Sequence, residues 1–248
     1  SSNIPKKIPM QSNPILAALD VPTPEKAIAL AEEIYPHVGG FKIGLELFTA
    51  GGSKTVKTIQ ALGKEIFLDL KFHDIPNTVA KAVVNATKLN VQWMTIHCAG
   101  GSEMIKAAEQ SAQETASSLG IAPPVILGVT VLTSMDQSQL NAIGVKHGVE
   151  DQVAALAEMA VLHGLRGLVC SPLELTRLRS LLPPSVHLVT PGIRAQKDAM
   201  GDQKRTLGPE EAIAAGASRL VIGRPIYAAP HPAEAALAIT RILEETTD

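Results

Sequence analysis

The chain has 248 residues, a formal net charge of −2, 46% hydrophobic residues and only 3% aromatic residues. The near-neutral charge and the lack of a polybasic tract argue against nucleic acid as a partner, as does the scarcity of aromatic side chains for stacking bases. No apolar run reaches the roughly 20 residues of a membrane span. The length suits one large α/β barrel or one to two smaller domains.

The first residues are polar and rich in proline, and they contain no hydrophobic signal-peptide core. We expect residues 1–12 to form a flexible lead-in and residues 13–248 to form the folded domain. Cys98 and Cys170 make no CxxC pair, so we expect buried, reduced thiols in a cytoplasmic protein.

Eight short runs of apolar and β-branched residues recur along the rest of the chain. Nearly continuous apolar runs are typical of strands that are buried on both faces of a parallel sheet. The predicted strands are 15–20, 40–44, 65–71, 93–98, 125–132, 167–171, 187–191 and 219–223.

The segments between these runs have apolar residues at helical spacing, most clearly within 24–38, 149–164, 208–217 and 232–245. Eight strand–helix units in a chain of this length predict an α/β fold, a single-domain (β/α)₈ TIM barrel. A doubly wound open sheet is the alternative. No GxGxxG follows the first strand, so a Rossmann nucleotide site has no support.

Charged residues lie at the carboxyl ends of the predicted strands, where barrel enzymes hold their chemistry. Asp69 and Lys71 are two residues apart, so on a regular strand they face the same side. Lys42 and Asp20, on adjacent strands, can join them, because alternating charges compensate one another when buried. A purely structural ion pair is the alternative, but four charges on three consecutive strands favour a functional site.

Asp74 comes three residues after Lys71, beyond the end of the predicted strand. We do not expect it to fold back beside Asp69 in the same subunit. Two roles stay open: it could cap a helix that begins near 77–78, or it could project into a neighbouring subunit.

Asp69, Lys71 and Asp74 form a D-x-K-x-x-D pattern within FLDLKFHDIPNTV. This pattern by itself is also found in a sister group of sugar-phosphate decarboxylases and aldolases. Together with six further motifs, it makes the chain resemble the bacterial orotidine 5′-monophosphate decarboxylases from Asp20 to Tyr227. These motifs are ALD (18–20), FKIG (41–44), VTVLTS (129–134), PGIR (191–194), GDQKR (201–205) and VIGRPI (221–226).

The resemblance implies a cytoplasmic, cofactor-free decarboxylase that converts orotidine 5′-monophosphate to uridine 5′-monophosphate and CO₂, the last step of de novo pyrimidine biosynthesis. It implies a homodimer with active sites at the interface. Lys71 would protonate C6 of the pyrimidine, and Asp69 would lie near the substrate carboxylate. Asp74, Ile75 and Thr78 would be contributed to the partner's site.

The resemblance also implies contacts with the rest of the substrate. The polar segment 194–206 is expected to close over the phosphate, with an ordinary surface loop as the alternative. The implied contacts are Asp20 and Lys42 with the ribose, Thr133 and Ser134 with the pyrimidine, and Gln203, Gly223 and Arg224 with the phosphate, with Arg194 nearby.

Two rival functions are considered. A metal-dependent barrel would use Mg²⁺ and would need a second carboxylate beside Asp69, for which Glu46 is the nearby candidate. A non-catalytic barrel that binds a phosphorylated ligand would not need a buried acid–amine–acid row. We expect no metal and assign structural roles to His73 and His97. The other histidines are scattered with no metal-ligand spacing: His37, His147, His163, His187 and His231.

Overall fold

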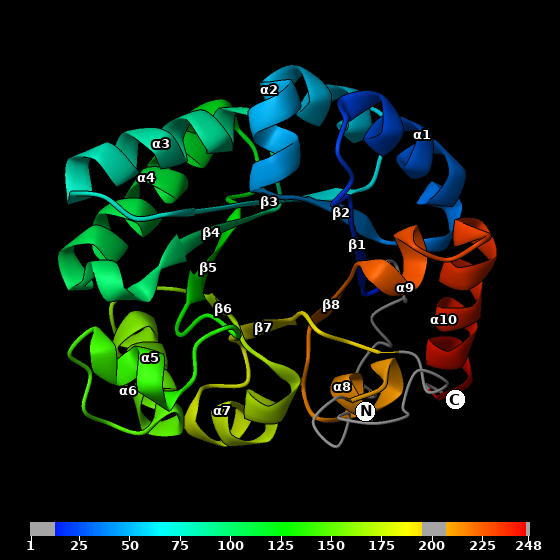
Figure 1. The fold of residues 1–248 in the computed structure, drawn as a ribbon. Helices are drawn as coiled ribbons and strands as arrows, with labels where there is room; N and C mark the ends of the chain where they lie inside the picture. Colours follow the sequence, from blue (N-terminus) through cyan, green and yellow to red (C-terminus); the bar gives the residue numbers. More distant parts are fainter. Residues whose placement is uncertain (1–12, 195–206, 247–248) are drawn as a thin grey trace, which may run out of the picture.

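The computed structural model describes residues 13–194 and 207–246, and its eight parallel strands close into a barrel in the order β1 to β8. Figure 1 shows the ring of strands with the helices outside it. Strand β8 closes the ring against β1, with Leu16 opposite Val221. The strands are β1 Ile15–Ala18, β2 Gly40–Ile43, β3 Glu65–Phe72, β4 Trp93–His97, β5 Val125–Val129, β6 Gly167–Val169, β7 His187–Thr190 and β8 Arg219–Ile222.

The helices follow the strands in alternation and cover the outside of the barrel (Figure 1). The α-helices are α1 Pro24–Ile34, α2 Leu45–Gln60, α3 Pro76–Lys88, α4 Ser102–Leu119, α5 Gln137–Ala142, α6 Val149–Leu162, α7 Leu175–Leu181, α8 Pro209–Ala214, α9 Arg224–Tyr227 and α10 Pro232–Thr246. Short 3₁₀ turns are η1 Tyr35–His37, η2 Cys98–Gly100 and η3 Pro172–Glu174.

The predicted (β/α)₈ barrel is confirmed, while several boundaries differ. The first strand ends at Ala18 and the fifth at Val129, two and three residues earlier than expected. The helix expected over 24–38 ends at Ile34 and continues as η1. The predicted lead-in lies outside the described residues, as does the segment 195–206 of the expected phosphate loop.

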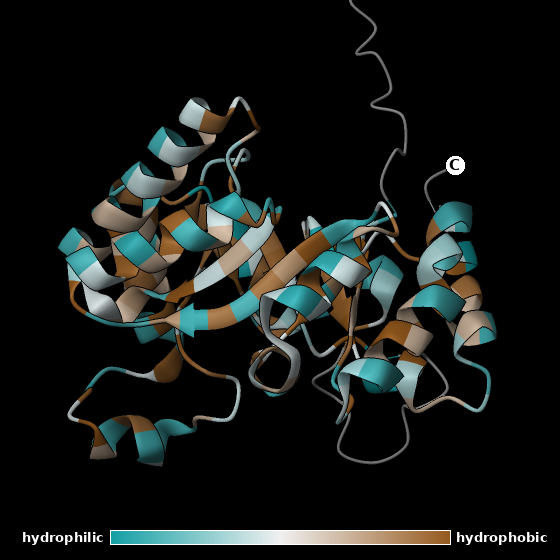
Figure 2. Cartoon of the chain, turned by 90° about the horizontal axis from the view of Figure 1, so that it is seen from above, coloured by the Kyte–Doolittle hydropathy of each residue, from teal (hydrophilic) through white to brown (hydrophobic). Residues whose placement is uncertain are grey.

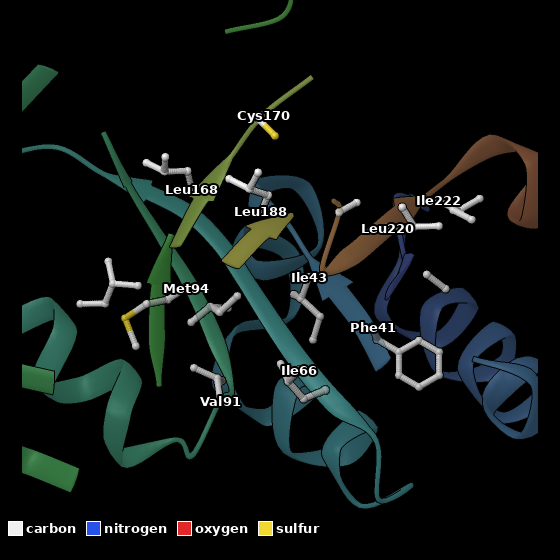
Figure 3. Close-up of a cluster of buried hydrophobic side chains, with 14 of the residues drawn as sticks. Phe41, Ile43, Ile66, Val91, Met94, Leu168, Cys170, Leu188, Leu220 and Ile222 are labelled. Atoms are coloured by element: carbon white, nitrogen blue, oxygen red, sulfur yellow. The ribbon is translucent and has the colours of Figure 1, made fainter. Parts of the chain in front are cut away.

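Two layers of apolar side chains fix the barrel. The larger layer lies between strands and helices and includes Phe41, Ile43, Ile66 and Met94, all buried, some of which Figure 3 draws. The helices contribute through one face, and in Figure 2 hydrophobic and hydrophilic residues alternate along them. The smaller layer fills the barrel interior and consists of Leu16, Ala18, Phe67, Trp93, Leu127, Val189 and Val221. Packing on both sides makes the strands a rigid support for side chains at their ends.

Candidate active site at the carboxyl ends of the strands

Four charged side chains of alternating sign lie side by side across the ends of β1, β2 and β3. The Nζ atom of Lys71 is 2.9 Å from both carboxylate oxygens of Asp69. The Nζ atom of Lys42 lies 3.9 Å from Asp69 Oδ2 and 3.1 Å from Asp20 Oδ1. We call Asp20, Lys42, Asp69 and Lys71 the charge row.

Burial decreases from the middle of the charge row toward its ends. The side chain of Asp69 is 11% exposed and that of Lys42 is 15% exposed, whereas the values are 30% for Lys71 and 44% for Asp20. A carboxylate as buried as Asp69 would be costly alone, so its two ammonium neighbours compensate for lost hydration. The arrangement leaves the Lys71 ammonium partly open, where it can meet a ligand.

A cavity of about 270 Å³ opens beside the charge row. Lys42, Asp69 and Lys71 line it, together with Thr133 and Ser134 from the segment after β5. A larger neighbouring cavity of about 710 Å³ shares residues 131–134 with it. The fold thus brings three residues of the charge row and both residues expected at the pyrimidine around one space.

Strand β3 is irregular where it carries the charged side chains. Leu68 lies opposite Met94 and Phe72 opposite Ile96, so a step of four residues on β3 faces a step of two on β4. Lys71 lies inside this bulge with φ at 48°, in the left-handed region. Asp69 and Lys71 do meet on one side, but the regular alternation that we expected of the strand does not hold beyond Leu68.

A threonine that was not among the expected site residues bridges the Lys71 backbone and the Asp69 carboxylate. Thr95 of β4 is fully buried, and its Oγ1 accepts a hydrogen bond from the Lys71 backbone N–H at 2.9 Å. The same hydroxyl donates to Asp69 Oδ1 at 2.8 Å. The only sign of it in the sequence is a polar residue within the apolar run 93–98.

The residues expected to act after β3 do not line this cavity. Asp74, Ile75 and Thr78 are exposed, and the Ile75 N–H donates to Asp74 Oδ1 at 2.7 Å. Helix α3 begins at Pro76 and has no side-chain cap, so the capping role considered for Asp74 is wrong. Among the ion pairs within 13–194 and 207–246, none joins Asp74 to Lys71.

The expected phosphate residues lie at the ends of β7 and β8. Gly223 precedes α9, and a Cβ atom there would come 3.3 Å from the Tyr227 ring, so the position is tight for a larger residue. Arg224 and Arg194 are both exposed. None of these three lines the cavity beside Lys71, and Gln203 lies outside the described residues.

Two histidines lie near the charge row. The rings of His73 and His97 have centroids 5.4 Å apart. Burial lowers the pKa of His97, with further lowering from His73 and Lys71 and an opposing effect of Asp69. His97 is therefore favoured in its neutral form, consistent with the structural role expected for it.

Glu46, the carboxylate considered for a metal-dependent site, is exposed in the first turn of α2. Within the described ranges, no group of three or more His, Cys, Asp or Glu side chains is arranged to hold a metal ion. The same part of the chain contains no helix long and apolar enough to span a bilayer.

Comparisons with known proteins agree with one another. Residues 13–239 match the model of the Orotidine 5'-phosphate decarboxylase / HUMPS family. The chain is 51% identical over 224 residues to an orotidine 5'-phosphate decarboxylase of Paramagnetospirillum magneticum, covering 90% of this chain and 95% of that protein. It is 46% identical over 231 residues to one of Moorella thermoacetica, covering 93% and 92%. The crystal structure of orotidine 5'-phosphate decarboxylase from Lactobacillus acidophilus superimposes with a TM-score of 0.82 at 36% identity, covering 93% of this chain and 99% of that chain.

Proposed function

Because the chain belongs to the orotidine 5'-phosphate decarboxylase / HUMPS family, we propose that its charge row carries out the decarboxylation, with Lys71 as the proton donor. The protein is a carboxy-lyase of pyrimidine biosynthesis, and it converts orotidine 5′-monophosphate to uridine 5′-monophosphate and CO₂ in the last de novo step. The observation that carries the mechanism is the Lys71 ammonium, 2.9 Å from both oxygens of Asp69 beside a cavity.

The chemistry explains why an ammonium is needed there. When the bond between C6 and the carboxylate breaks, CO₂ leaves and the electron pair stays on C6, in an sp² orbital that the ring delocalises poorly. A fixed positive charge next to that carbon stabilises the developing negative charge. Lys71 then transfers a proton from Nζ to C6 and is reprotonated from solvent. Asp69 holds the ammonium in place through both of its carboxylate oxygens.

We assign the remaining expected contacts to the substrate. Thr133 and Ser134 line the cavity and contact the pyrimidine, and Asp20 and Lys42 contact the ribose. The phosphate is bound from the ends of β7 and β8, where such barrels commonly hold phosphates. The phosphate contacts are Arg194, Gln203, Gly223 and Arg224.

We also propose a homodimer in which Asp74, Ile75 and Thr78 complete the partner's site. Their exposure supports this assignment, above all the 66% exposure of the apolar Ile75 side chain. The two free, buried cysteines suit a reducing compartment, so we place the protein in the cytoplasm.

The direct test follows the loss of orotidine monophosphate by absorbance. Lys71→Ala should lower kcat on the order of 10³-fold or more, because stabilisation of the carbanion and its protonation are both lost. Exhaustive chelation should leave the wild-type rate unchanged. Lys57→Ala, at an exposed position of α2, is the control for removing a lysine. Near-normal turnover by Lys71→Ala would refute the mechanism, and loss of activity on chelation would favour the metal-dependent rival.

The shared site has its own test. Asp74→Ala and Lys71→Ala homodimers should each be nearly inactive, whereas mixed dimers contain one site with neither substitution. Part of the wild-type rate should therefore return after subunit exchange. No recovery, with exchange verified by native mass spectrometry, would contradict the assignment of Asp74 to the partner's site.

A further inference from the structure

The hydroxyl of Thr95 connects the backbone of Lys71 to the carboxylate that holds the Lys71 side chain. Its Oγ1 lies 2.9 Å from the Lys71 amide nitrogen and 2.8 Å from Asp69 Oδ1, and its residue is fully buried. The Lys71 Nζ atom completes a closed ring of hydrogen bonds by donating to both Asp69 oxygens. Three groups on two strands are therefore fixed relative to one another.

The backbone of Lys71 needs such a restraint. A non-glycine residue in the left-handed region, here with φ at 48°, costs on the order of 1–2 kcal/mol. The bulge turns the Lys71 amide toward a side chain on β4, where Thr95 accepts its hydrogen bond. Without that acceptor, a partly buried N–H group would lack a partner and the bulge could relax toward a regular strand.

The direction of the two hydrogen bonds also follows from the geometry. A hydroxyl carries one proton, and Thr95 uses its oxygen to accept from the Lys71 amide, so its proton points to Asp69. Asp69 thereby acts as acceptor toward Thr95 and toward the ammonium. These acceptor bonds fix the orientation of the Asp69 carboxylate and, through it, the position of the Lys71 ammonium.

We propose that Thr95 is a positioning residue for the decarboxylation: it holds the bulge of β3 so that the Lys71 ammonium and the Asp69 carboxylate face the reacting carbon together. This inference rests on the proposed role of Lys71. Thr95 does not touch the substrate, since it is buried behind Asp69 and does not line the cavity. Its loss should therefore affect turnover more than binding.

The test compares two substitutions at this position. Thr95→Val keeps the shape but removes the hydroxyl, and kcat should fall on the order of 10- to 100-fold, the effect of a misplaced catalytic group. KM should stay within about threefold, because contacts with the ribose and phosphate remain. Thr95→Ser keeps the hydroxyl and should retain kcat within about fivefold. If Thr95→Val does not fold, Thr95→Cys takes its place in the comparison with Thr95→Ser, because the thiol is of similar size but a weak hydrogen-bond donor.

Thr87→Val is the matched control. Thr87 is also fully buried, and its hydroxyl donates to the Val83 carbonyl within α3 at 2.7 Å. The Thr87→Val variant should lose about as much thermal stability as Thr95→Val, but its kcat should stay that of the wild type. The positioning role is overturned if folded Thr95→Val turns over within twofold of wild type, or if Thr95→Ser falls as far as Thr95→Val. Lys71→Ala, measured in parallel, separates the failure of the proposed mechanism from the failure of the positioning role. Full activity of Lys71→Ala would refute the mechanism, whatever the result for the Thr95 variants.

Discussion

The two ends of the barrel both carry opposite charges inside the ring of strands, but they pair them differently. At the amino end, Arg219 of β8 binds Glu65 of β3 through Nε at 2.9 Å and through a second nitrogen at 3.2 Å. The guanidinium also stacks over the Trp93 ring, 5.3 Å from its centroid, and the Trp93 indole N–H donates to Glu65 at 3.3 Å. The Trp93 indole nitrogen and all three guanidinium nitrogens of Arg219 therefore have acceptors within the chain.

At the carboxyl end, two carboxylates and two ammonium groups alternate in the charge row. Asp69 is shared between Lys71 and Lys42, and a cavity lies beside all three. The amino end therefore resembles a closed structural pair, whereas at the carboxyl end the Lys71 side chain is 30% exposed beside a cavity and its ammonium can meet an anionic ligand. In this barrel, the charged cluster with a partly exposed ammonium and an adjoining cavity is therefore the one that indicates function.

The different roles of the two ends are tested most directly by neutralising one carboxylate at each end of the barrel. Asp69→Asn should lower kcat on the order of 10³-fold, because the Lys71 ammonium loses the carboxylate that holds it in place beside the cavity. The change in the free energy of unfolding should be no more than about 2 kcal/mol. Steady-state kinetics and urea unfolding of the same preparation measure both. A variant that stays active but unfolds readily would reverse the roles assigned to the two ends.

The matching change at the amino end is Glu65→Gln. The side chains of Glu65 and Arg219 are only 24% and 19% exposed, so loss of this pair should cost about 1–3 kcal/mol in the free energy of unfolding. The kcat value should stay within twofold of wild type. Glu103→Gln, in the exposed pair with Lys106, is the control and should cost less than about 0.5 kcal/mol. A large loss of turnover in Glu65→Gln would show that the ends are coupled.

The difference between the ends could be predicted from the sequence only in part. Short apolar runs alternating with helical segments predict the barrel, because strand periodicity and burial are local properties. The same periodicity predicts Asp69 and Lys71 on one side, where the structure has them, although a bulge and not regular alternation brings them together. Strand ends were less predictable, as at Ala18 and Val129, because they depend on pairing with neighbouring strands.

The bulge in β3 and the role inferred for Thr95 could not be predicted in this way. Left-handed backbone is expected at glycine, and nothing local in the sequence indicates it at Lys71. Threonine in a strand usually packs, so Thr95 resembles a core residue until the register between β3 and β4 is known. The roles proposed for Asp74, Ile75 and Thr78 depend on a second copy, whose position one sequence does not specify.

A smaller effect on stability should come from protonation of His187 at the amino end of the barrel. The pKa of His187 is lowered by burial first and then by Arg219, Arg166 and Arg179, while Glu65 acts in the opposite direction. The folded protein therefore binds fewer protons at this site than the unfolded chain. Stability from this group is fully present above the ordinary pKa of about 6.5 and is lost as the pH falls through the lower folded value.

The measurement is the free energy of unfolding at pH 7.5 and 5.5. The decrease on acidification should be smaller in His187→Gln than in wild type, because one histidine that must be charged on unfolding is gone. His231→Gln, at an exposed position, should leave the decrease unchanged. An equal decrease in wild type and His187→Gln would mean that acid sensitivity originates elsewhere, with His97 at the carboxyl end as the next group to test.

The smallest expected effect is that of a thiol reagent on the two cysteines. It tests whether the carboxyl end contains a reactive group besides the charge row. Burial raises the pKa of both Cys98 and Cys170 to about 12, although Cys170 lines the cavity beside Lys71. Because the thiolate is the reactive form, neither thiol should react with a thiol reagent in the native protein at pH 8, and activity should be retained during the incubation. Both should react once the chain is unfolded in urea. Fast native modification with loss of turnover would show that Cys170 is open to the cavity, and the carboxyl end would then hold a reactive nucleophile besides its charge row.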